Sequence, residues 1–255
     1  MKKIYRFTNE NLTSFDNIYN FSNAKVLSVV GSGDQYFTSL LNGAKEIELY
    51  DNNDLAWDYF LLKYYSILIL SYEEFFDYFV IKKLDDYSYF EKIKKYLSPY
   101  IAYKIGKLYN KNKQISYLFE YENMEYNYND GIYIPYLNIE NYYKLQTMLS
   151  KSKVPVFHPS SFSNLPKQLA NNYYDIVIAS NIFYNLNFKE EINKVSEYKE
   201  LLNKFNYSEF QAIYSWWLNN DLKQKLLENN FEINEVKSTM KLKLTNDCVI
   251  SLKKK

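Results

Sequence analysis

Residues 25–53, KVLSVVGSGDQYFTSLLNGAKEIELYDNN, constrain the fold of this 255-residue chain more than any other stretch. The run Val26–Val30 is mostly apolar and β-branched, as in a strand that is buried on both faces of a parallel sheet. The segment Gly31–Gly33 then predicts a tight turn, because glycine allows backbone conformations and close approaches that a side chain forbids. The stretch therefore predicts a strand, a glycine turn, a helix and a second strand.

The helix after the glycine turn is predicted to cover Gln35–Leu41. Asp34 stands where its carboxylate can cap the free N–H groups of the first helical turn. The second strand, Ile47–Tyr50, ends at Asp51. About 20 residues separate Gly31 from this acid, the interval that nucleotide-binding β-α-β units place between the glycine turn and a ribose-binding carboxylate.

The glycine turn and the acid together favour a ligand that contains adenosine. Taken alone, Gly31 and Gly33 are also compatible with a plain turn between a strand and a helix. The third glycine of the dinucleotide fingerprint is absent, and Asp34 puts an acid where a diphosphate needs close backbone approach. A ligand with adenosine, no phosphate and a positive charge fits better, and S-adenosylmethionine is such a ligand. The predicted binding residues in this stretch are Gly31, Ser32, Gly33, Asp34, Asp51 and Asn52.

Each of these residues has an expected role. Asp51 holds the ribose hydroxyls, with Asn52 or Asn53 assisting, and the two glycines give clearance for the ligand. Ordinary methyltransferases usually carry an acid two residues before the first glycine, whereas this chain has Val29 there. Asp34 is the candidate replacement, and it is expected to bind the methionine amino group or to face the sulfonium.

Several stretches resemble a known family. VLSVVGSGDQ, GAKEIELYDNN and LAWDYFLLKYYSILILSYEEFFDYF are similar to the betaine-lipid synthase-like S-adenosylmethionine-dependent transferases, and YDIVIASNIFYNL at 174–186 resembles a later sheet motif of that family. YRFTNENL resembles the start of its short bacterial members. The resemblance implies transfer of the 3-amino-3-carboxypropyl group to a small-molecule or lipid acceptor, such as a diacylglycerol hydroxyl. The second domain that completes a betaine headgroup has no room here, so the full lipid pathway is not implied.

The last part of the chain predicts how the sheet is completed. Residues 231–238 and 248–253 alternate polar and apolar side chains, as an antiparallel pair should. NAD-binding sheets finish parallel, whereas class I methyltransferase-like sheets finish in an antiparallel hairpin. We expect one α/β domain over residues 1–255 with this Rossmann-like, class I methyltransferase-like sheet. Residues 71–150 are expected to form a helical insertion that closes over the ligand and selects the acceptor.

Two later strand ends supply further candidate site residues. Ser161 and Phe162 follow the predicted strand Val154–Phe157, where this fold usually positions adenine, although a simple loop fits equally well. The predicted strand Tyr174–Ala179 ends at Ser180, at the carboxyl edge where ligands bind in open α/β sheets; a strand cap is the alternative. The candidate catalytic residues on the acceptor side are Asn181 and Tyr184.

Composition excludes several classes of function. The 31 basic and 30 acidic residues nearly balance, so bulk charge does not predict a nucleic-acid partner. A single cysteine, Cys248, excludes an internal disulfide, and a single histidine, His158, argues against a His-based metal site or a Ser-His-Asp triad. His158 is interpreted as a buried or strand-end residue, with a place near the site as an alternative. The 29 tyrosines are attributed to codon bias rather than to a base-stacking surface.

A cytoplasmic enzyme is expected. MKKIYRFTNENL lacks an apolar core after its lysines, and the apolar run near Tyr64–Leu70 is far shorter than the ~20 residues of a membrane span. Attack on the methyl of S-adenosylmethionine gives methylation, and attack on Cγ gives aminocarboxypropyl transfer. The resemblance favours the second reaction, and base rates for the fold favour the first. A non-catalytic binding module is a third interpretation, supported by the altered first motif, and no sequence signal fixes an oligomeric state.

Overall fold

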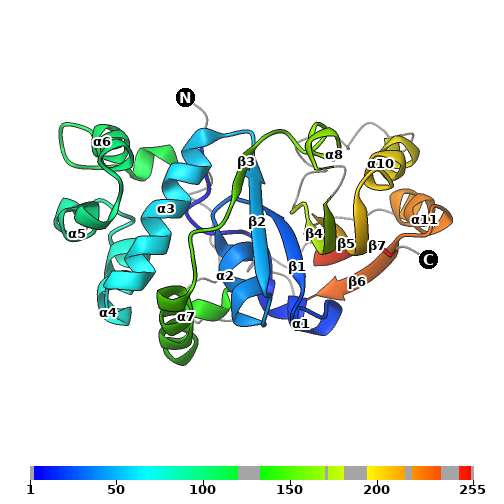
Figure 1. The fold of residues 1–255 in the computed structure, drawn as a ribbon, viewed down its shortest axis with the longest axis horizontal. Coiled ribbons are helices and arrows are strands. Elements are labelled where there is room, and N and C mark those ends of the chain that lie inside the picture. The colour runs from blue at the N-terminus through cyan, green and yellow to red at the C-terminus, as the bar shows by residue number, and fades with distance from the viewer. Residues whose placement is uncertain are drawn as a thin grey trace.

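The computed structural model describes residues 3–119, 133–169, 172–180, 194–215, 220–236 and 247–253. These residues contain a seven-stranded sheet with the order β3-β2-β1-β4-β5-β7-β6 (Figure 1). The strands are β1 (Lys25–Val29), β2 (Glu46–Asp51), β3 (Phe157–Pro159), β4 (Tyr173–Ile178), β5 (Asn206–Ser215), β6 (Glu232–Val236) and β7 (Asp247–Lys253).

Strands β1 to β5 pair in parallel, whereas β7 runs antiparallel to both β5 and β6. The predicted α/β fold with a parallel sheet and a final antiparallel hairpin is therefore confirmed. The chain passes from β1 outward to β2 and β3, and then returns to the other side of β1 to form β4. This reversal makes the carboxyl ends of β1 and β4 the topological switch point, which is where open α/β sheets bind ligands.

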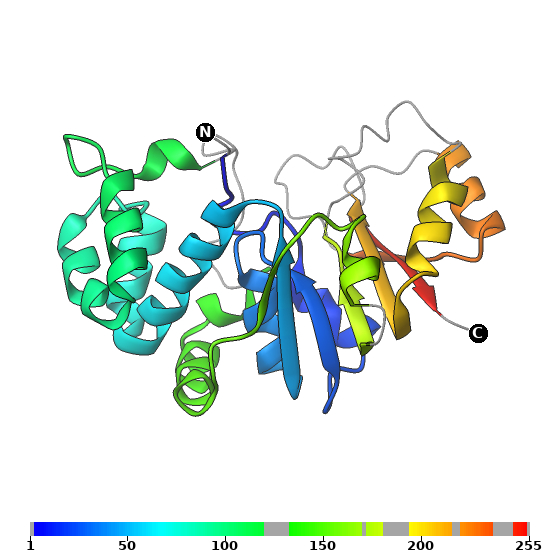
Figure 2. The same cartoon turned by 45° about the horizontal axis from the view of Figure 1, so that its top comes forward.

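Helices cover both faces of the sheet (Figure 2). Each face has its own hydrophobic cluster. Helices α2, α3 and α7 pack on one face, whereas α8, α10 and α11 pack on the other. The α-helices are α1 (Phe15–Ile18), α2 (Asp34–Leu41), α3 (Asp54–Ile69), α4 (Tyr72–Phe76), α5 (Tyr87–Ile93), α6 (Pro99–Leu108), α7 (Ile139–Lys151), α8 (Leu165–Gln168), α10 (Lys194–Leu202) and α11 (Asn220–Glu228). Short 3₁₀ or π turns cover Leu12–Ser14, Asp77–Ile81, Lys94–Tyr96, Ser116–Leu118 and Pro135–Leu137.

The segment between β2 and β3 divides into two parts. Helices α4, α5 and α6 lie beyond α3, at the end of the molecule away from β6 (Figures 1 and 2). Helix α7 packs instead against α2 and α3, so it covers the sheet as an ordinary crossover helix does. Within residues 71–150, the helices that project from the sheet layers are therefore those before α7.

Two local predictions are wrong. The third strand begins at Phe157 rather than Val154, because Pro155 lacks an N–H for the ladder and Val154 and Val156 are exposed. Asp34 does not cap α2: Gly33 is the N-cap residue, and Asp34 is the first helical residue, with its carboxylate turned to other partners.

Candidate functional site

The glycine turn and the acid predicted from the sequence meet at the carboxyl edge of β1 and β2. The backbone N–H of Gly31 donates to Asp51 Oδ2 at 3.1 Å, and the N–H of Val30 donates to the carbonyl of Tyr50 at 2.8 Å. Gly31 and Gly33 have φ values of +50° and +85°. A Cβ at Gly33 would stand 2.9 Å from a ring carbon of Phe60, so this position requires glycine on two grounds.

Asp51 is partly exposed and is oriented by backbone groups on both sides. Its Oδ1 accepts from the N–H of Asn53 at 2.9 Å, while Oδ2 accepts from Gly31. The carbonyl of Asp51 accepts from the N–H of Ser160 at 2.9 Å, which holds the loop after β3 beside the acid. Asn52 is exposed at the same edge. A carboxylate held in this way can accept hydrogen bonds from a pair of vicinal hydroxyls.

Asp34 is fully buried and is bound entirely by groups of the protein. Its Oδ1 lies 2.8 Å from Lys63 Nζ and accepts from the hydroxyl of Tyr136. Its Oδ2 accepts from the N–H of Thr8 at 2.6 Å and from Ser32 Oγ at 2.7 Å. Burial lowers the pKa of Lys63 to about 8, although the charge of Asp34 opposes this shift. The carboxylate that the sequence assigned to the ligand therefore has a cation and three further donors inside the fold.

The same cluster holds the N-terminal segment against α3. Lys63 Nζ donates to the carbonyl of Arg6 at 2.8 Å, and the hydroxyl of Tyr59 donates to that carbonyl at 2.6 Å. The guanidinium of Arg6 donates to the carbonyl of Phe79 at 2.9 Å. These contacts hold the N-terminal segment across the carboxyl edge of the sheet. Glu10, in this segment, therefore lies at that edge.

Glu10 is the buried acid at this edge that the sequence did not single out. Its side chain is 0% exposed, and its carboxylate accepts from Ser180 Oγ and, at 3.3 Å, from Gln35 Nε2. Burial raises the pKa of Glu10 to about 7, and repulsion from Asp34 and Asp247 acts in the same direction. An acid in an irregular segment has no periodicity and no fixed spacing to the glycine turn, so only the fold reveals its position.

The remaining candidate site residues differ in how far they are buried. Ser180, at the end of β4, has φ +56°, and its carbonyl accepts from the N–H of Tyr214 at 3.1 Å. Phe162 is buried, with its ring centroid 5.7 Å from that of Tyr50 and 5.1 Å from that of Phe205. Ser161 is partly exposed on the preceding loop. Asn181 and Tyr184 lie outside the described residues.

His158 belongs to a polar network on the sheet. The carboxylate of Glu48 lies 2.7 Å from His158 Nε2 and 2.8 Å from Lys25 Nζ, and it accepts from the hydroxyl of Tyr174 at 2.9 Å. These side chains come from β1, β2, β3 and β4. Lys25 balances the charge of the Glu48 carboxylate. The network joins four strands and lies away from the Gly31–Asp51 edge.

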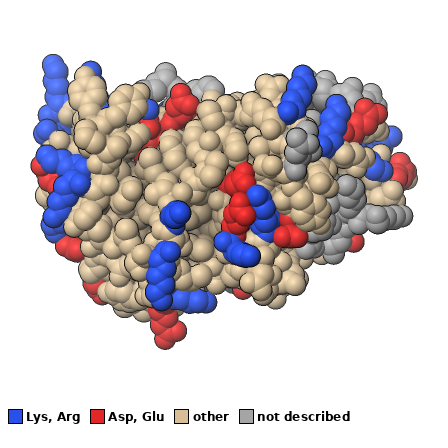
Figure 3. All heavy atoms as spheres, viewed as in Figure 1, with Lys and Arg blue, Asp and Glu red and all other residues tan. Residues whose placement is uncertain are grey.

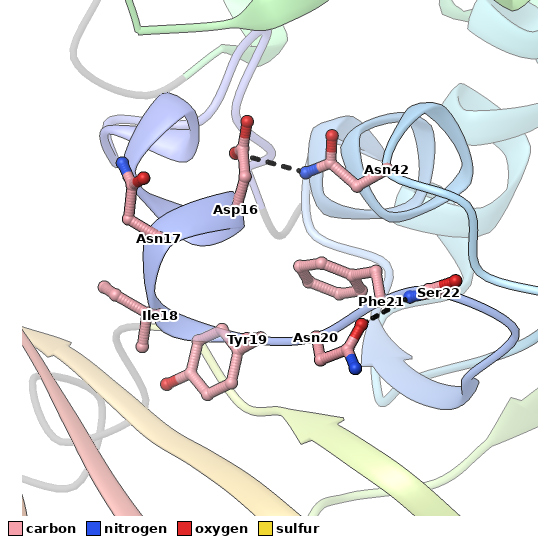
Figure 4. A pocket seen from close by; sticks show the side chains of 8 residues that line it. All are labelled: Asp16, Asn17, Ile18, Tyr19, Asn20, Phe21, Ser22 and Asn42. Carbon is pink, nitrogen blue, oxygen red and sulfur yellow. Dashed lines mark hydrogen bonds between the residues drawn. The ribbon is translucent and has the colours of Figure 1, made fainter.

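Two hollows open elsewhere on the surface. The first, about 430 Å³, is lined by α1, the segment leading into β1, and Asn42 at the end of α2 (Figure 4). Asn42 Nδ2 donates to Asp16 Oδ1 across it at 3.2 Å. The second, about 560 Å³, lies between residues 11–18 and β6. The first adjoins the start of β1, at the sheet edge opposite Gly31, so it is separate from the candidate site.

The distribution of surface charge does not single out the candidate site. In Figure 3, Lys and Arg side chains lie along the outer edge formed by α5 and α6 and near the sheet, with acidic side chains beside both groups. Within the described ranges, no three His, Cys, Asp or Glu side chains gather so that they could hold a metal ion. No helix in the described ranges has the length and apolar character of a membrane span.

Comparison with known proteins gives a limited result. No protein-family model matches the chain, and no curated protein matches it. The family resemblance noted in the sequence is therefore not supported. Among solved structures, the chain is similar to a ribosomal protein L11 methylase from Lactobacillus delbrueckii subsp. bulgaricus, with 12% identity and a TM-score of 0.40. The match covers 98% of this chain and 81% of that one, and a likeness of this size does not bear on the activity of the chain.

Proposed function

We propose that this chain is an S-adenosylmethionine-dependent methyltransferase with a class I methyltransferase-like sheet. The observation that carries the proposal is the hydrogen bond between Gly31 N–H and Asp51 Oδ2 at the carboxyl edge of the sheet. The strand order β3-β2-β1-β4-β5-β7-β6, with β7 antiparallel, supports the fold part of the proposal. Glycine turn, acid and switch point thus coincide, as they do in nucleotide-binding sheets.

The residues at this edge fit the parts of such a ligand. Asp51 would accept from the ribose hydroxyls, and Gly31 lets the backbone of the turn approach the ligand closely. The loop containing Ser160 and Ser161 is held beside Asp51 and would border the adenine. Ser180 stands at the neighbouring end of β4, towards which the methionine part would extend.

The reaction depends on alignment of the acceptor with the electrophilic carbon more than on a strong acid or base. S-adenosylmethionine supplies an electrophilic carbon, which the acceptor attacks in line as the C–S bond breaks and its electron pair stays on sulfur. The positive charge of the sulfonium disappears in this step, so a site that excludes water and holds both partners in line promotes it. Asn181 and Tyr184 are proposed to position a small-molecule or lipid acceptor, and the proton it loses passes to solvent.

A second candidate activity is transfer of the 3-amino-3-carboxypropyl group, which the sequence resemblance favours. The two reactions leave different nucleosides. Incubation of the pure protein with S-adenosylmethionine and an extract of its source cells, followed by mass spectrometry, separates them. S-adenosylhomocysteine is the expected product, and methylthioadenosine would replace the methyl proposal with the second candidate.

Binding has to be tested apart from turnover. Isothermal titration calorimetry with S-adenosylmethionine is expected to show one site per chain. Absence of binding would overturn the proposed function. Binding without a nucleoside product in any extract would favour a non-catalytic module that keeps the fold for contacts with a partner.

A further inference from the structure

We propose that Glu10, together with Gln35 and Ser180, binds the positively charged amino group of the ligand. The N-terminal segment that carries Glu10 would then be part of the binding site. The identity of the ligand rests on the proposed function, because S-adenosylmethionine carries an ammonium group at the end of its methionine part. The assignment replaces Asp34, the acid that the sequence suggested for this role.

The first observation is a difference between two buried acids. Asp34 has a cation, since Lys63 Nζ lies 2.8 Å from it. Glu10 is equally enclosed, but in the described part of the chain no basic side chain forms an ion pair with it. A buried carboxylate without a cation is costly to the folded state. A ligand that brings a positive charge to Glu10 removes this cost, whereas a ligand at Asp34 would have to compete with Lys63.

The second observation is a buried acceptor with no partner beside Glu10. Gln35 is 2% exposed, and its Nε2 donates to Glu10 Oε2 at 3.3 Å and to Thr8 Oγ1 at 3.2 Å. Among the residues that the structure describes, none donates a hydrogen bond to its Oε1. This oxygen lies 4.0 Å from the position that a Cβ would take on Gly31, so it faces the glycine turn. Buried acceptors in folded proteins are rarely left unpaired, so this oxygen is available to a donor group of the ligand.

An ammonium group suits both features at once. It carries three donors and a full positive charge. One donor would reach Gln35 Oε1 and another the carboxylate of Glu10, which already accepts from Ser180. A hydroxyl or a water could satisfy Gln35 but would leave the charge of Glu10 unbalanced.

The order of the strands puts this group in the right place along the ligand. β1 pairs with β2 on one side and with β4 on the other. Asp51 is the last residue of β2 and Ser180 follows β4, so the two stand on opposite sides of the turn after β1. A ligand lying across Gly31 would have its ribose at Asp51 and its amino end at Glu10. Because Glu10 is fully enclosed, the N-terminal segment must shift for the ligand to enter and then return over it.

The test compares three nucleosides by calorimetry. S-adenosylmethionine and S-adenosylhomocysteine both carry the ammonium group, whereas methylthioadenosine lacks it. In Glu10→Gln, affinity for the first two is expected to fall about 10- to 100-fold, as for loss of a charge-assisted hydrogen bond. Affinity for methylthioadenosine is expected to stay the same, which also shows that the variant is folded. Glu73→Gln, at an exposed glutamate of α4, is the matched control and is expected to bind all three as the unmodified protein does.

Each contrary outcome has a separate meaning. Unchanged binding of all three nucleosides by Glu10→Gln would overturn this inference and leave the proposed function standing. Weaker binding of S-adenosylmethionine alone would mean that Glu10 faces the sulfonium, and the ammonium assignment would be wrong. Weaker binding of methylthioadenosine as well would mean that Glu10 acts through the fold rather than on the amino group. If the unmodified protein bound none of the three, the proposed function would fail and this inference with it.

Discussion

Lys63 Nζ lies 2.8 Å from Asp34 Oδ1, and both side chains are fully buried. The pair joins α2 to α3 directly behind the glycine turn. Each partner also holds the N-terminal segment, because Asp34 accepts from the N–H of Thr8 and Lys63 donates to the carbonyl of Arg6. The ammonium of Lys63 lies 4.5 Å from the ring centroid of Phe7 in the same segment. The ion pair therefore positions the segment that brings Glu10 to the site.

Removing one partner of this pair is expected to destabilise the protein strongly. In Lys63→Met the carboxylate of Asp34 stays buried without its cation, so the free energy of unfolding should fall by about 3–5 kcal/mol in urea denaturation. Adding Asp34→Asn should recover part of the loss, because the uncompensated charge is then gone. Lys92→Met, which breaks the exposed pair with Glu74, is the control and should cost at most about 1 kcal/mol. Equal losses in the two lysine variants would contradict this role for the buried pair.

The titration of Glu10 gives a second prediction, on stability against pH. Burial and repulsion from Asp34 and Asp247 raise its pKa from 4.5 to about 7, and hydrogen bonds from Ser180 and Gln35 only partly oppose this. Between these pH values the folded state keeps a proton that the unfolded state has released. The contribution of Glu10 to stability is therefore present below pH 4.5 and is lost as the pH rises through about 7.

Glu10→Gln removes this titration. Its free energy of unfolding, measured relative to the unmodified protein, is expected to increase between pH 4.5 and 7.5 by up to about 3 kcal/mol. Urea denaturation at pH 4.5, 6 and 7.5 measures the difference, and Glu73→Gln should show no such trend. A pH-independent difference would mean that Glu10 is ionised throughout this range in the folded protein.

Local sequence pattern predicted the parts of the fold whose interactions are local. The apolar run of β1, the glycine turn, α2 and β2 follow from residues within about 30 positions of one another, and the alternation in β6 and β7 predicted the hairpin. The Gly31–Asp51 contact was predictable because a βαβ unit fixes that spacing. The partners of Asp34 were not predictable in this way, because Lys63 and Tyr136 lie 29 and 102 residues away in the sequence.

Glu10 also could not be identified as a site residue from local sequence pattern. Its partner Ser180 is 170 residues distant, and only the order of the strands brings the two together. Burial is what makes this acid unusual, and burial is a property of the packed chain rather than of its neighbours in sequence. The sequence could suggest a cofactor site at this edge, but it could not say which of two acids already had a cation.

The glycine turn gives a prediction with a built-in control. Gly33→Ala combines a φ of +85° with a Cβ 2.9 Å from Phe60, so it is expected to lower the free energy of unfolding by about 1–3 kcal/mol. Gly106→Ala, in the last turn of α6, has no positive φ and only ordinary contact with Phe90, so it should be neutral or stabilising by up to about 1 kcal/mol. Thermal and urea unfolding of the two variants compare them directly. A harmless Gly33→Ala would show that the turn adjusts more easily than its geometry indicates.

Asp51→Ala separates the ribose contact from the amino-group contact. Because the ribose is common to S-adenosylmethionine, S-adenosylhomocysteine and methylthioadenosine, loss of this carboxylate should weaken all three by about 10- to 100-fold. Glu10→Gln should weaken only the two that carry an ammonium, so the pair of variants distinguishes the two ends of the ligand. Asn53→Ala is the control, because it removes only the side chain of Asn53. The N–H donor to Asp51 Oδ1 is a backbone group and survives this substitution; affinity should therefore change little although the α3 cap is lost. If Asp51→Ala weakened S-adenosylmethionine but not methylthioadenosine, the acid would face the methionine part, and the ligand would lie across the turn in the opposite direction.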